Sequence, residues 1–224
     1  MTMLSSLELI RRVPLFSMLT DAQAVSVADA VVKRRFKRGE VIVEQGKKTN
    51  ALFILLNGRA RVITSDSRGR EVILATLRPG DHIGEMSLID NEPHSATVRA
   101  EVQTDVLMLG RTEFARCLPE NSSMAYAVMR GLVQRLRQAD RKIESLALMD
   151  VYGRVARALL EFAVEEGDGT LLIRERLSSQ DIAKMVGASR EMVSRVMKDL
   201  EERGFIQTQD DGAIAVKDRL TTLN

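Results

Sequence analysis

The chain has 224 residues, of which 45% are hydrophobic and 29% charged, and its formal net charge is +2. This length predicts two domains, each with its own core, and the nearly neutral balance means that attraction for an anionic partner has to come from local clusters of cations. No apolar run approaches the roughly 20 residues that span a bilayer, and charged residues stand near the N-terminus where a secretion signal is apolar, so we expect a cytoplasmic protein with no membrane partner.

The composition also argues against metal and catalytic sites. Cys117 is the only cysteine and there are two histidines, so one chain can assemble neither a disulfide framework nor a zinc or cysteine-bound iron–sulfur site. Phosphate-binding loops, paired-histidine motifs and dinucleotide signatures are missing. The sequence therefore predicts a protein that is not an enzyme and binds no metal.

The first half of the chain is predicted to be rich in β-strands. Short β-branched segments alternate with glycine turns, and strands are expected at 41–43, 52–56, 60–64, 72–77, 96–100 and 106–109. This spacing is typical of a small antiparallel barrel or sandwich.

A long helix is predicted from Ser122 to Met149, where neither proline nor a turn cluster interrupts the chain. Its apolar residues advance by three or four positions and form one stripe: Val128, Leu132, Leu136, Ala139, Ile143 and Leu146. A narrow stripe on a helix of this length favours a parallel homodimer, and packing against the chain's own β domain is the alternative.

The segment from 177 to 204 has the pattern of a helix-turn-helix, with the turn at Gly187. Ser178, followed three residues later by Asp181, is a capping-box start for the first helix, and Ser189 is the expected N-cap of the second. Before this motif, residues 150–153 are expected to form a hinge and 154–165 a helix.

On an ideal helical wheel the second helix separates into two faces. The polar face holds Arg190, Glu191, Ser194, Arg195 and Lys198, and the opposite face, which is expected to be buried, holds Met192, Val193, Val196, Met197 and Leu200. The polar face carries the side chains that hydrogen-bond to base edges and phosphates, so we expect DNA recognition rather than a solvated amphipathic helix.

Four segments of the chain resemble parts of one known family. Residues 34–62 resemble the opening of a cyclic-nucleotide-binding β-roll, 83–100 its phosphate-binding cassette, 146–163 the hinge and first helix of a DNA-binding domain, and 187–201 a recognition helix. In this combination they resemble the bacterial cyclic AMP receptor and fumarate–nitrate regulator (CRP/FNR) superfamily. The resemblance implies an α+β fold in three parts: a β-roll at 1–121, a dimerisation helix at 122–149 and a winged helix-turn-helix domain at 150–224.

For the cassette, the resemblance implies a site for a cyclic nucleotide. Gly84 and Glu85, with Met86 beside them, match positions that engage the ribose, and Ser95 with the Ala96 amide match positions that hold the cyclic phosphate. The family has an arginine immediately before this serine, whereas here the residue is His94. Imidazole is shorter, cannot form the bidentate fork and is only partly charged at neutral pH, so we expect weak binding of cyclic AMP. His82 and His94 are expected as surface or cassette residues rather than haem ligands.

The adenine contacts of the family also differ in this chain. Its Thr–Ser pair corresponds here to Ala139 and Asp140. A carboxylate at 140 can accept from the N1–H and the 2-amino group of guanine, which adds a guanine nucleotide such as cyclic di-GMP to cyclic AMP as a candidate effector. Two alternatives remain: Asp140 is a solvated helix charge, or the protein is a constitutive regulator with a vestigial pocket.

For the DNA-binding domain, the resemblance implies a dimer on a pseudo-palindromic operator with TGTGA-like half-sites. Arg190, Glu191 and Arg195 match the base-reading positions of the family. Arginine suits guanine, and a carboxylate accepts from the cytosine amino group. Phosphate contacts are expected from Ser179, Gln180, Ser189 and Lys198. RNA polymerase is the implied partner in activation. A nucleotide-gated interaction subunit, such as a kinase regulator, would share the β-roll but would not need this recognition helix.

Overall fold

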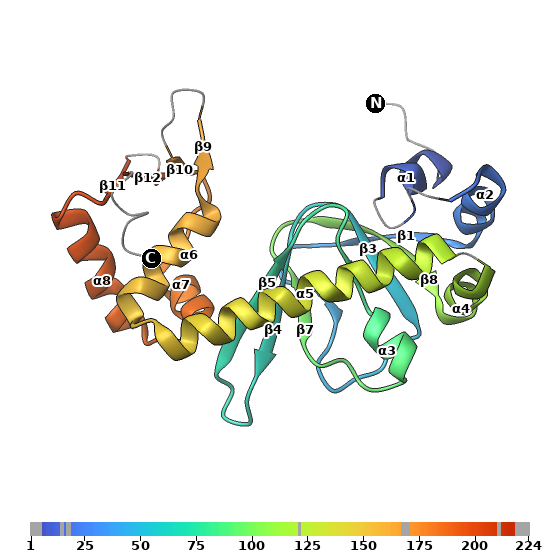
Figure 1. The fold of residues 1–224 in the computed structure, drawn as a ribbon, viewed down its shortest axis with the longest axis horizontal. Coiled ribbons are helices and arrows are strands. Elements are labelled where there is room, and N and C mark those ends of the chain that lie inside the picture. The colour runs from blue at the N-terminus through green and yellow to red at the C-terminus, as the bar shows by residue number, and fades with distance from the viewer. Residues whose placement is uncertain are drawn as a thin grey trace. The chain divides into compact units, whose positions relative to one another are not determined.

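The computed structural model describes residues 6–13, 16, 19–120, 122–166, 171–209 and 212–217. The chain divides into two compact units, Met1–Leu136 and Arg137–Asn224 (Figure 1). The first unit is rich in strands, the second consists of helices with one small sheet, and the long helix α5 (Ser122–Leu148) contributes to both. The fold is therefore α+β, as predicted.

The first unit is built around two four-stranded antiparallel sheets. Their strands are β1 (Val32–Phe36), β2 (Val41–Val43), β3 (Ala51–Asn57), β4 (Ala60–Ser65), β5 (Glu71–Leu77), β6 (His82–Ile83), β7 (Thr97–Ala100) and β8 (Thr104–Gly110). One sheet has the order β1-β8-β3-β6 and the other β2-β7-β4-β5. The helices besides α5 are α1 (Ser6–Arg12), α2 (Asp21–Ala30), α3 (Glu85–Asp90) and α4 (Arg111–Glu120).

Both faces of strand β3 are packed against other parts of the first unit. Leu52 and Ile54 point into a cluster shared with α1, α2 and α5, whereas Phe53 and Leu55 point into the cluster between the sheets. Successive side chains of a strand alternate between faces, so a run of consecutive apolar residues is stable only where both faces are covered. The strand is buried from Ala51 to Leu55 for this reason.

All six predicted strands are present, with ends that differ by at most two residues. Two further strands have weak sequence signals. Strand β1 is an edge strand whose first four residues are exposed, so it shows no apolar alternation, and β6 has only two residues.

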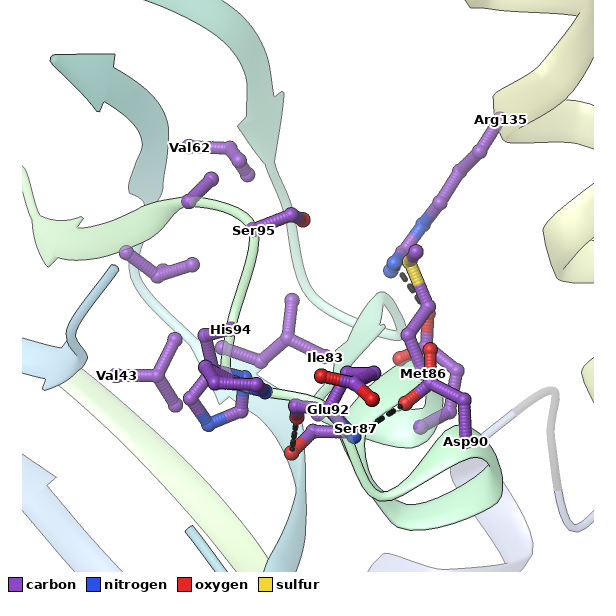
Figure 2. A pocket seen from close by; sticks show the side chains of 15 residues that line it. Val43, Val62, Ile83, Met86, Ser87, Asp90, Glu92, His94, Ser95 and Arg135 are labelled. Atoms are coloured by element: carbon purple, nitrogen blue, oxygen red, sulfur yellow. Dashed lines mark hydrogen bonds and ion pairs between the residues drawn. The ribbon is translucent and has the colours of Figure 1, made fainter. Parts of the chain in front are cut away.

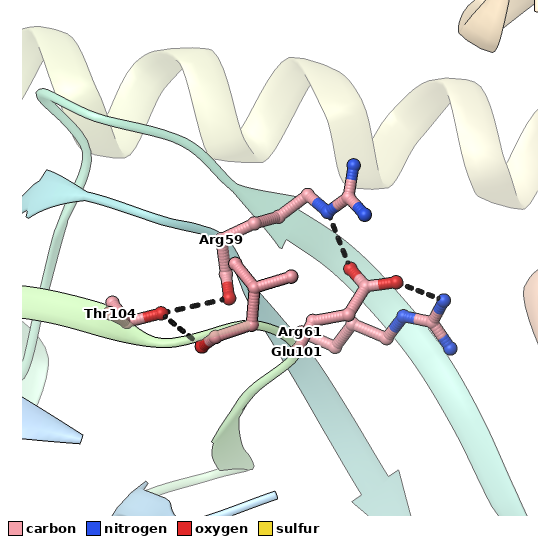
Figure 3. Close-up of polar contacts among 5 residues, drawn as sticks. Arg59, Arg61, Glu101 and Thr104 are labelled. Carbon is pink, nitrogen blue, oxygen red and sulfur yellow. Dashed lines mark hydrogen bonds and ion pairs between the residues drawn. The ribbon is translucent and has the colours of Figure 1, made fainter. Parts of the chain in front are cut away.

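An ion-paired triad holds the start of β4 against the turn between β7 and β8 (Figure 3). Glu101 accepts from Nε of Arg59 at 2.7 Å and from Nη2 of Arg61 at 2.5 Å. Thr104 Oγ1 donates to the Arg59 carbonyl at 3.1 Å. Gly58 completes this corner with φ +89°, and a Cβ there would lie 2.6 Å from Thr104 Oγ1, so only glycine fits.

The second unit contains the helix-turn-helix and a small sheet that forms the wing. Its helices are α6 (Val151–Phe162), α7 (Ser179–Val186) and α8 (Arg190–Glu202), and its strands are β9 (Val164–Glu165), β10 (Leu171–Ile173), β11 (Ile206–Thr208) and β12 (Ile214–Val216), in the order β11-β12-β10-β9. The core holds Val155 and Leu159 of α6, Ile182 of α7, and Val193 and Leu200 of α8. Each helix of this unit therefore buries one face against the other two.

The helix predicted at 154–165 differs from α6 at both ends. The Asp150 carboxylate accepts from the Gly153 amide at 2.8 Å and caps α6, so most of the predicted hinge forms the first turn of this helix. The helix ends at Phe162. Val164 and Glu165, which were predicted to be helical, form strand β9 and pair with β10. The break after α5 is confined to Met149 and Asp150.

Helix α5 has the predicted length, but its apolar stripe divides between two environments. Val128 is 3% exposed and lies in the core of the first unit, where Leu132 packs against the same cluster. The alternative of packing on its own domain is therefore correct for these two residues. Several other large apolar residues of α5 are exposed in the chain, and we call five of them, spaced by three, four, three and seven residues, the α5 seam: Tyr126, Met129, Val133, Leu136 and Ile143. No helix of the described residues combines the length and the apolarity needed to cross a membrane.

Candidate functional site

A cavity of about 210 Å³ lies beside α3 in the first unit (Figure 2). Six of the seven predicted ligand-binding residues line it: Gly84, Glu85, Met86, His94, Ser95 and Ala96. The seventh, Asp140, belongs to the second unit, where its side chain is exposed. Apolar side chains of β2, β4, β6 and β7 form the floor, and Arg135 of α5 reaches the cavity from the side.

Glu85 is the buried carboxylate of this cavity, with 1% of its surface exposed. Arg135 donates from Nη1 to Glu85 Oε1 at 2.5 Å and from Nη2 to the carbonyl of His82. Burial raises the pKa of Glu85, and the Arg135 guanidinium opposes this increase. Glu85 Oε2 is buried and has no hydrogen-bond partner among the described residues. One carboxylate oxygen is therefore bound to the protein and the other remains available to a ligand.

Gly84 places this carboxylate. Its φ is +94°, and a Cβ at this position would lie 2.6 Å from the Ala51 carbonyl oxygen. Any other residue would push the loop away from β3 and displace Glu85 at the start of α3. The glycine is thus required by the backbone, as well as matching the family's cassette.

His94 differs from the expectation of a partly charged group. Its Nε2 lies 2.7 Å from Thr49 Oγ1, and its side chain is buried. The backbone is also fixed, because its N–H donates to the Lys47 carbonyl and its carbonyl accepts from Gly46. Burial lowers the pKa of His94, which shifts the imidazole further towards its neutral form. Arg135 is then the only cation among the described lining residues, and it is already paired with Glu85.

Ser95 and Ala96 keep free donors at the same end of the cavity. The Ser95 side chain is exposed, and no backbone carbonyl of the described residues accepts from the amide of Ser95 or Ala96. Adjacent free amides and a hydroxyl can bind an anion without a cation. The phosphate end of the cavity therefore offers neutral donors.

His82 stands immediately before the lining residue Ile83 and is buried, so of the two expectations for it, a surface residue or a cassette residue, the first is wrong. Burial lowers its pKa to about 4, and the nearby Arg135 guanidinium acts in the same direction. Its ring packs against α5, where a Cβ on Gly131 would lie 2.8 Å from it. The neutral ring and the small glycine allow α5 to approach the cavity closely.

Sequence reasoning missed two residues of this site, Arg135 and Thr49. Each partner lies far along the chain, 50 residues from Arg135 to Glu85 and 45 from Thr49 to His94. The one available signal was the position of Arg135 on the predicted long helix. Among the described residues, no three His, Cys, Asp or Glu side chains gather where they could hold a metal ion.

The helix-turn-helix is formed as the caps predict. Ser178 Oγ accepts from the Asp181 amide at 3.0 Å, and Ser189 Oγ accepts from the Met192 amide at 3.2 Å. Gly187 ends α7 with φ +65°. These contacts satisfy donors at the starts of both helices and fix the sharp turn between them.

The predicted polar face of α8 is exposed in full: Arg190, Glu191, Ser194, Arg195 and Lys198. The opposite face is buried at Val193 and Leu200 and half-buried at Val196 and Met197, but Met192 is 47% exposed, so its assignment to the buried face is wrong. The pKa of Glu191 is lowered by its own backbone N–H and by the Ser189 hydroxyl, so it stays ionised. Gln180 and Ser189 are exposed and Ser179 is half-buried at the same end of the motif.

A β sandwich with a small-molecule cavity, a long helix and a winged helix-turn-helix define a DNA-binding transcription regulator. Residues 33–121 match the cyclic nucleotide-binding domain and residues 153–220 the Crp-like helix-turn-helix domain. The chain belongs to the CRP/FNR family of transcription regulators, which are not enzymes and bind DNA as dimers.

Two relatives and one solved structure illustrate the likeness. The cAMP-activated global transcriptional regulator Vfr of Pseudomonas aeruginosa is 34% identical over 79% of this chain and 86% of its own length. The cAMP-activated global transcriptional regulator CRP of Escherichia coli O157:H7 is 30% identical over 77% of this chain and 83% of its own length. The structure of the c-di-GMP responsive global regulator CLP of Xanthomonas campestris has a TM-score of 0.76 at 23% identity, covers 88% of this chain and 98% of its own, and shows the fold alone.

Proposed function

We propose that this chain is a homodimeric, sequence-specific regulator whose affinity for its operator is set by a cyclic nucleotide bound beside α3. The observation that carries ligand control is the free oxygen of Glu85, which is buried at the edge of a cavity in a domain of the cyclic nucleotide-binding family. A buried carboxylate oxygen without a partner is costly, and a ribose hydroxyl supplies the missing donor.

In this proposal the first 121 residues bind the ligand, residues 122–149 form the dimer and residues 150–224 bind DNA. The protein acts in the cytoplasm, with RNA polymerase as its partner in activation. Gly84, Glu85 and Met86 contact the sugar, and Ser95 with the Ala96 amide binds the cyclic phosphate. A ligand changes operator affinity only by binding the DNA-competent arrangement of the two recognition helices more tightly than the incompetent one.

The effector is proposed to be cyclic AMP or a guanine nucleotide such as cyclic di-GMP. The relatives named as cAMP-activated favour cyclic AMP, whereas the neutral His94 removes the cation that would bind its phosphate. Asp140 follows Leu136 by four residues and precedes Ile143 by three, so it continues the spacing of the α5 seam. In a parallel dimer two such carboxylates face each other, and the N1–H and 2-amino group of guanine are donors that would stabilise them.

Calorimetric titration of the nucleotide-free protein with cyclic AMP, cyclic GMP and cyclic di-GMP separates these possibilities. We expect one of the three to bind and to raise or lower affinity for an operator duplex in a parallel fluorescence titration. If none binds and the empty protein holds its operator fully, the alternative of a constitutive regulator with a vestigial pocket is correct.

His94→Arg should strengthen binding of any nucleotide that carries a cyclic phosphate, by about ten- to hundredfold. A charged bidentate donor would replace a neutral imidazole, and hydrogen bonds to charged groups contribute about 1.5–3 kcal/mol. Calorimetry with cyclic AMP measures the gain. Adenosine, which has no phosphate, is the control ligand, and an equal gain for adenosine would show that the new arginine does not contact the phosphate.

Arg190→Ala should weaken binding to a TGTGA-type palindrome by about 1–3 kcal/mol and relax the preference for one guanine. Arg190 is exposed on the polar face of α8, where its guanidinium can reach O6 and N7 of guanine. Lys198→Ala is the matched control, because a phosphate contact should weaken all duplexes alike and lower the salt dependence. Titration of single-base operator variants at two salt concentrations tests both. Unchanged affinity of Arg190→Ala for the palindrome would remove Arg190 from the base-reading set.

A further inference from the structure

Met192 is an exposed apolar side chain on the recognition helix. It lies in the first turn of α8, where its amide is capped by Ser189, and 47% of its surface is exposed. On the helical wheel it stands about 60° beyond Arg195, at the border of the polar face. Met192 therefore adjoins the base-reading residues while contributing an apolar surface.

Packing within the domain does not account for this residue. The neighbouring Val193 is fully buried, and Val196 and Met197 pack against the core of the second unit. Met192 does not belong to that core among the described residues. An exposed, unbranched apolar side chain that is free of the core can instead contact a surface outside the protein.

We propose that Met192 reads the C5-methyl group of a thymine in the major groove, an inference that rests on the proposed entry of α8 into that groove. The thymine methyl is the apolar feature that bases present there, and the first residues of a recognition helix are those that reach base edges. Arg190 and Arg195 donate to guanine, so neither can distinguish thymine by hydrogen bonding alone. The flexible thioether of Met192 supplies the complementary apolar contact.

Uracil substitution isolates this contact, because deoxyuridine lacks only the methyl group and keeps every hydrogen-bonding group of thymine. The operator is first selected from a random duplex pool with the parent protein, and every thymine of both half-sites is then replaced. The parent should lose about fourfold in affinity per contacted methyl group, hence about fifteenfold for the two half-sites of a dimer. Met192→Gln, similar in size but polar, should show no difference between the two duplexes, and Met192→Leu should retain the preference.

The control duplex carries uracil only outside the half-sites. Thermal unfolding should show that Met192→Gln is as stable as the parent, because the side chain is exposed. An equal loss for the parent and Met192→Gln would overturn the assignment, since another group would then contact the methyl. A parent that binds both duplexes equally would overturn it too, while leaving DNA recognition intact. If the pool yields no bound duplex, the proposed function fails and this inference fails with it.

Discussion

Leu136→Glu should dissociate the dimer and abolish operator binding at concentrations where the parent is bound. Leu136 is 62% exposed in the chain and lies in the middle of the α5 seam. In a parallel dimer the substitution brings two carboxylates into an apolar interface, and burial of an unpaired charge costs several kcal/mol. Since each 1.4 kcal/mol is a factor of ten, the dimer dissociation constant should rise by at least about a hundredfold. Sedimentation velocity measures the assembly state directly.

Gln138→Glu is the matched control for this experiment. It introduces the same charge on the same helix, and its side chain is exposed but lies outside the α5 seam. This variant should remain dimeric and bind the operator like the parent. An intact dimer of Leu136→Glu would mean that the subunits meet through another surface and that the exposed residues of α5 have a different partner.

The twofold symmetry of the operator follows from the twofold symmetry of this dimer. Two recognition helices that enter successive major grooves on one side of the duplex must lie about 34 Å apart, so their half-sites are related by a twofold axis. A monomeric variant can contact only one half-site, and the loss of the second set of contacts is what removes operator binding. The seam and the recognition helices therefore have to be tested together.

The sequence was sufficient for most strands of the first unit, for the long helix and for the two helices of the helix-turn-helix. β-Branched runs between glycines identified six strands, because each packs at least one face on a core. The serine caps located the starts of α7 and α8, since each serine side chain satisfies a backbone group of its own helix, and Gly187 located the end of α7. Such signals act over a few residues, which is why they can be recognised in a single sequence.

The parts of the site that escaped prediction depend on distant segments. Neither the Arg135–Glu85 pair nor the His94–Thr49 hydrogen bond leaves a local pattern, because each forms only after the sandwich has assembled. The charge of His94 shows the consequence. Its ordinary pKa suggests partial protonation, and the burial that the fold imposes lowers this pKa and favours the neutral form.

The prediction that Met192 is buried was wrong for a different reason. A helical wheel gives the direction of each side chain but not the width of the surface that covers the helix. The buried strip of α8 is centred on Val193 and Leu200, and Met192 lies at the edge of the apolar arc farthest from that centre. An apolar arc that is wider than the core it faces leaves its border residues exposed.

Arg135→Met should destabilise the protein by about 2–3 kcal/mol and make its stability more sensitive to pH. The substitution keeps the aliphatic stem but leaves Glu85, which is 1% exposed, without its cation. Breaking a fully buried ion pair costs about 3–5 kcal/mol. We expect a smaller cost here because 35% of the Arg135 side chain is exposed and screened by solvent. Urea unfolding of the parent and the variant measures the difference.

The sign of the pH dependence follows from Glu85. Burial already raises the pKa of this carboxyl, and removal of Arg135 raises it further. A folded-state pKa above the unfolded value means that stability is greatest below the unfolded pKa and is lost as the pH rises through the folded pKa. The deficit of Arg135→Met relative to the parent should therefore be large at mildly alkaline pH and shrink under mildly acidic conditions. Adding Glu85→Gln should restore most of the stability, because a neutral amide needs no cation; a double variant as unstable as Arg135→Met would show that Arg135 acts mainly through the His82 carbonyl.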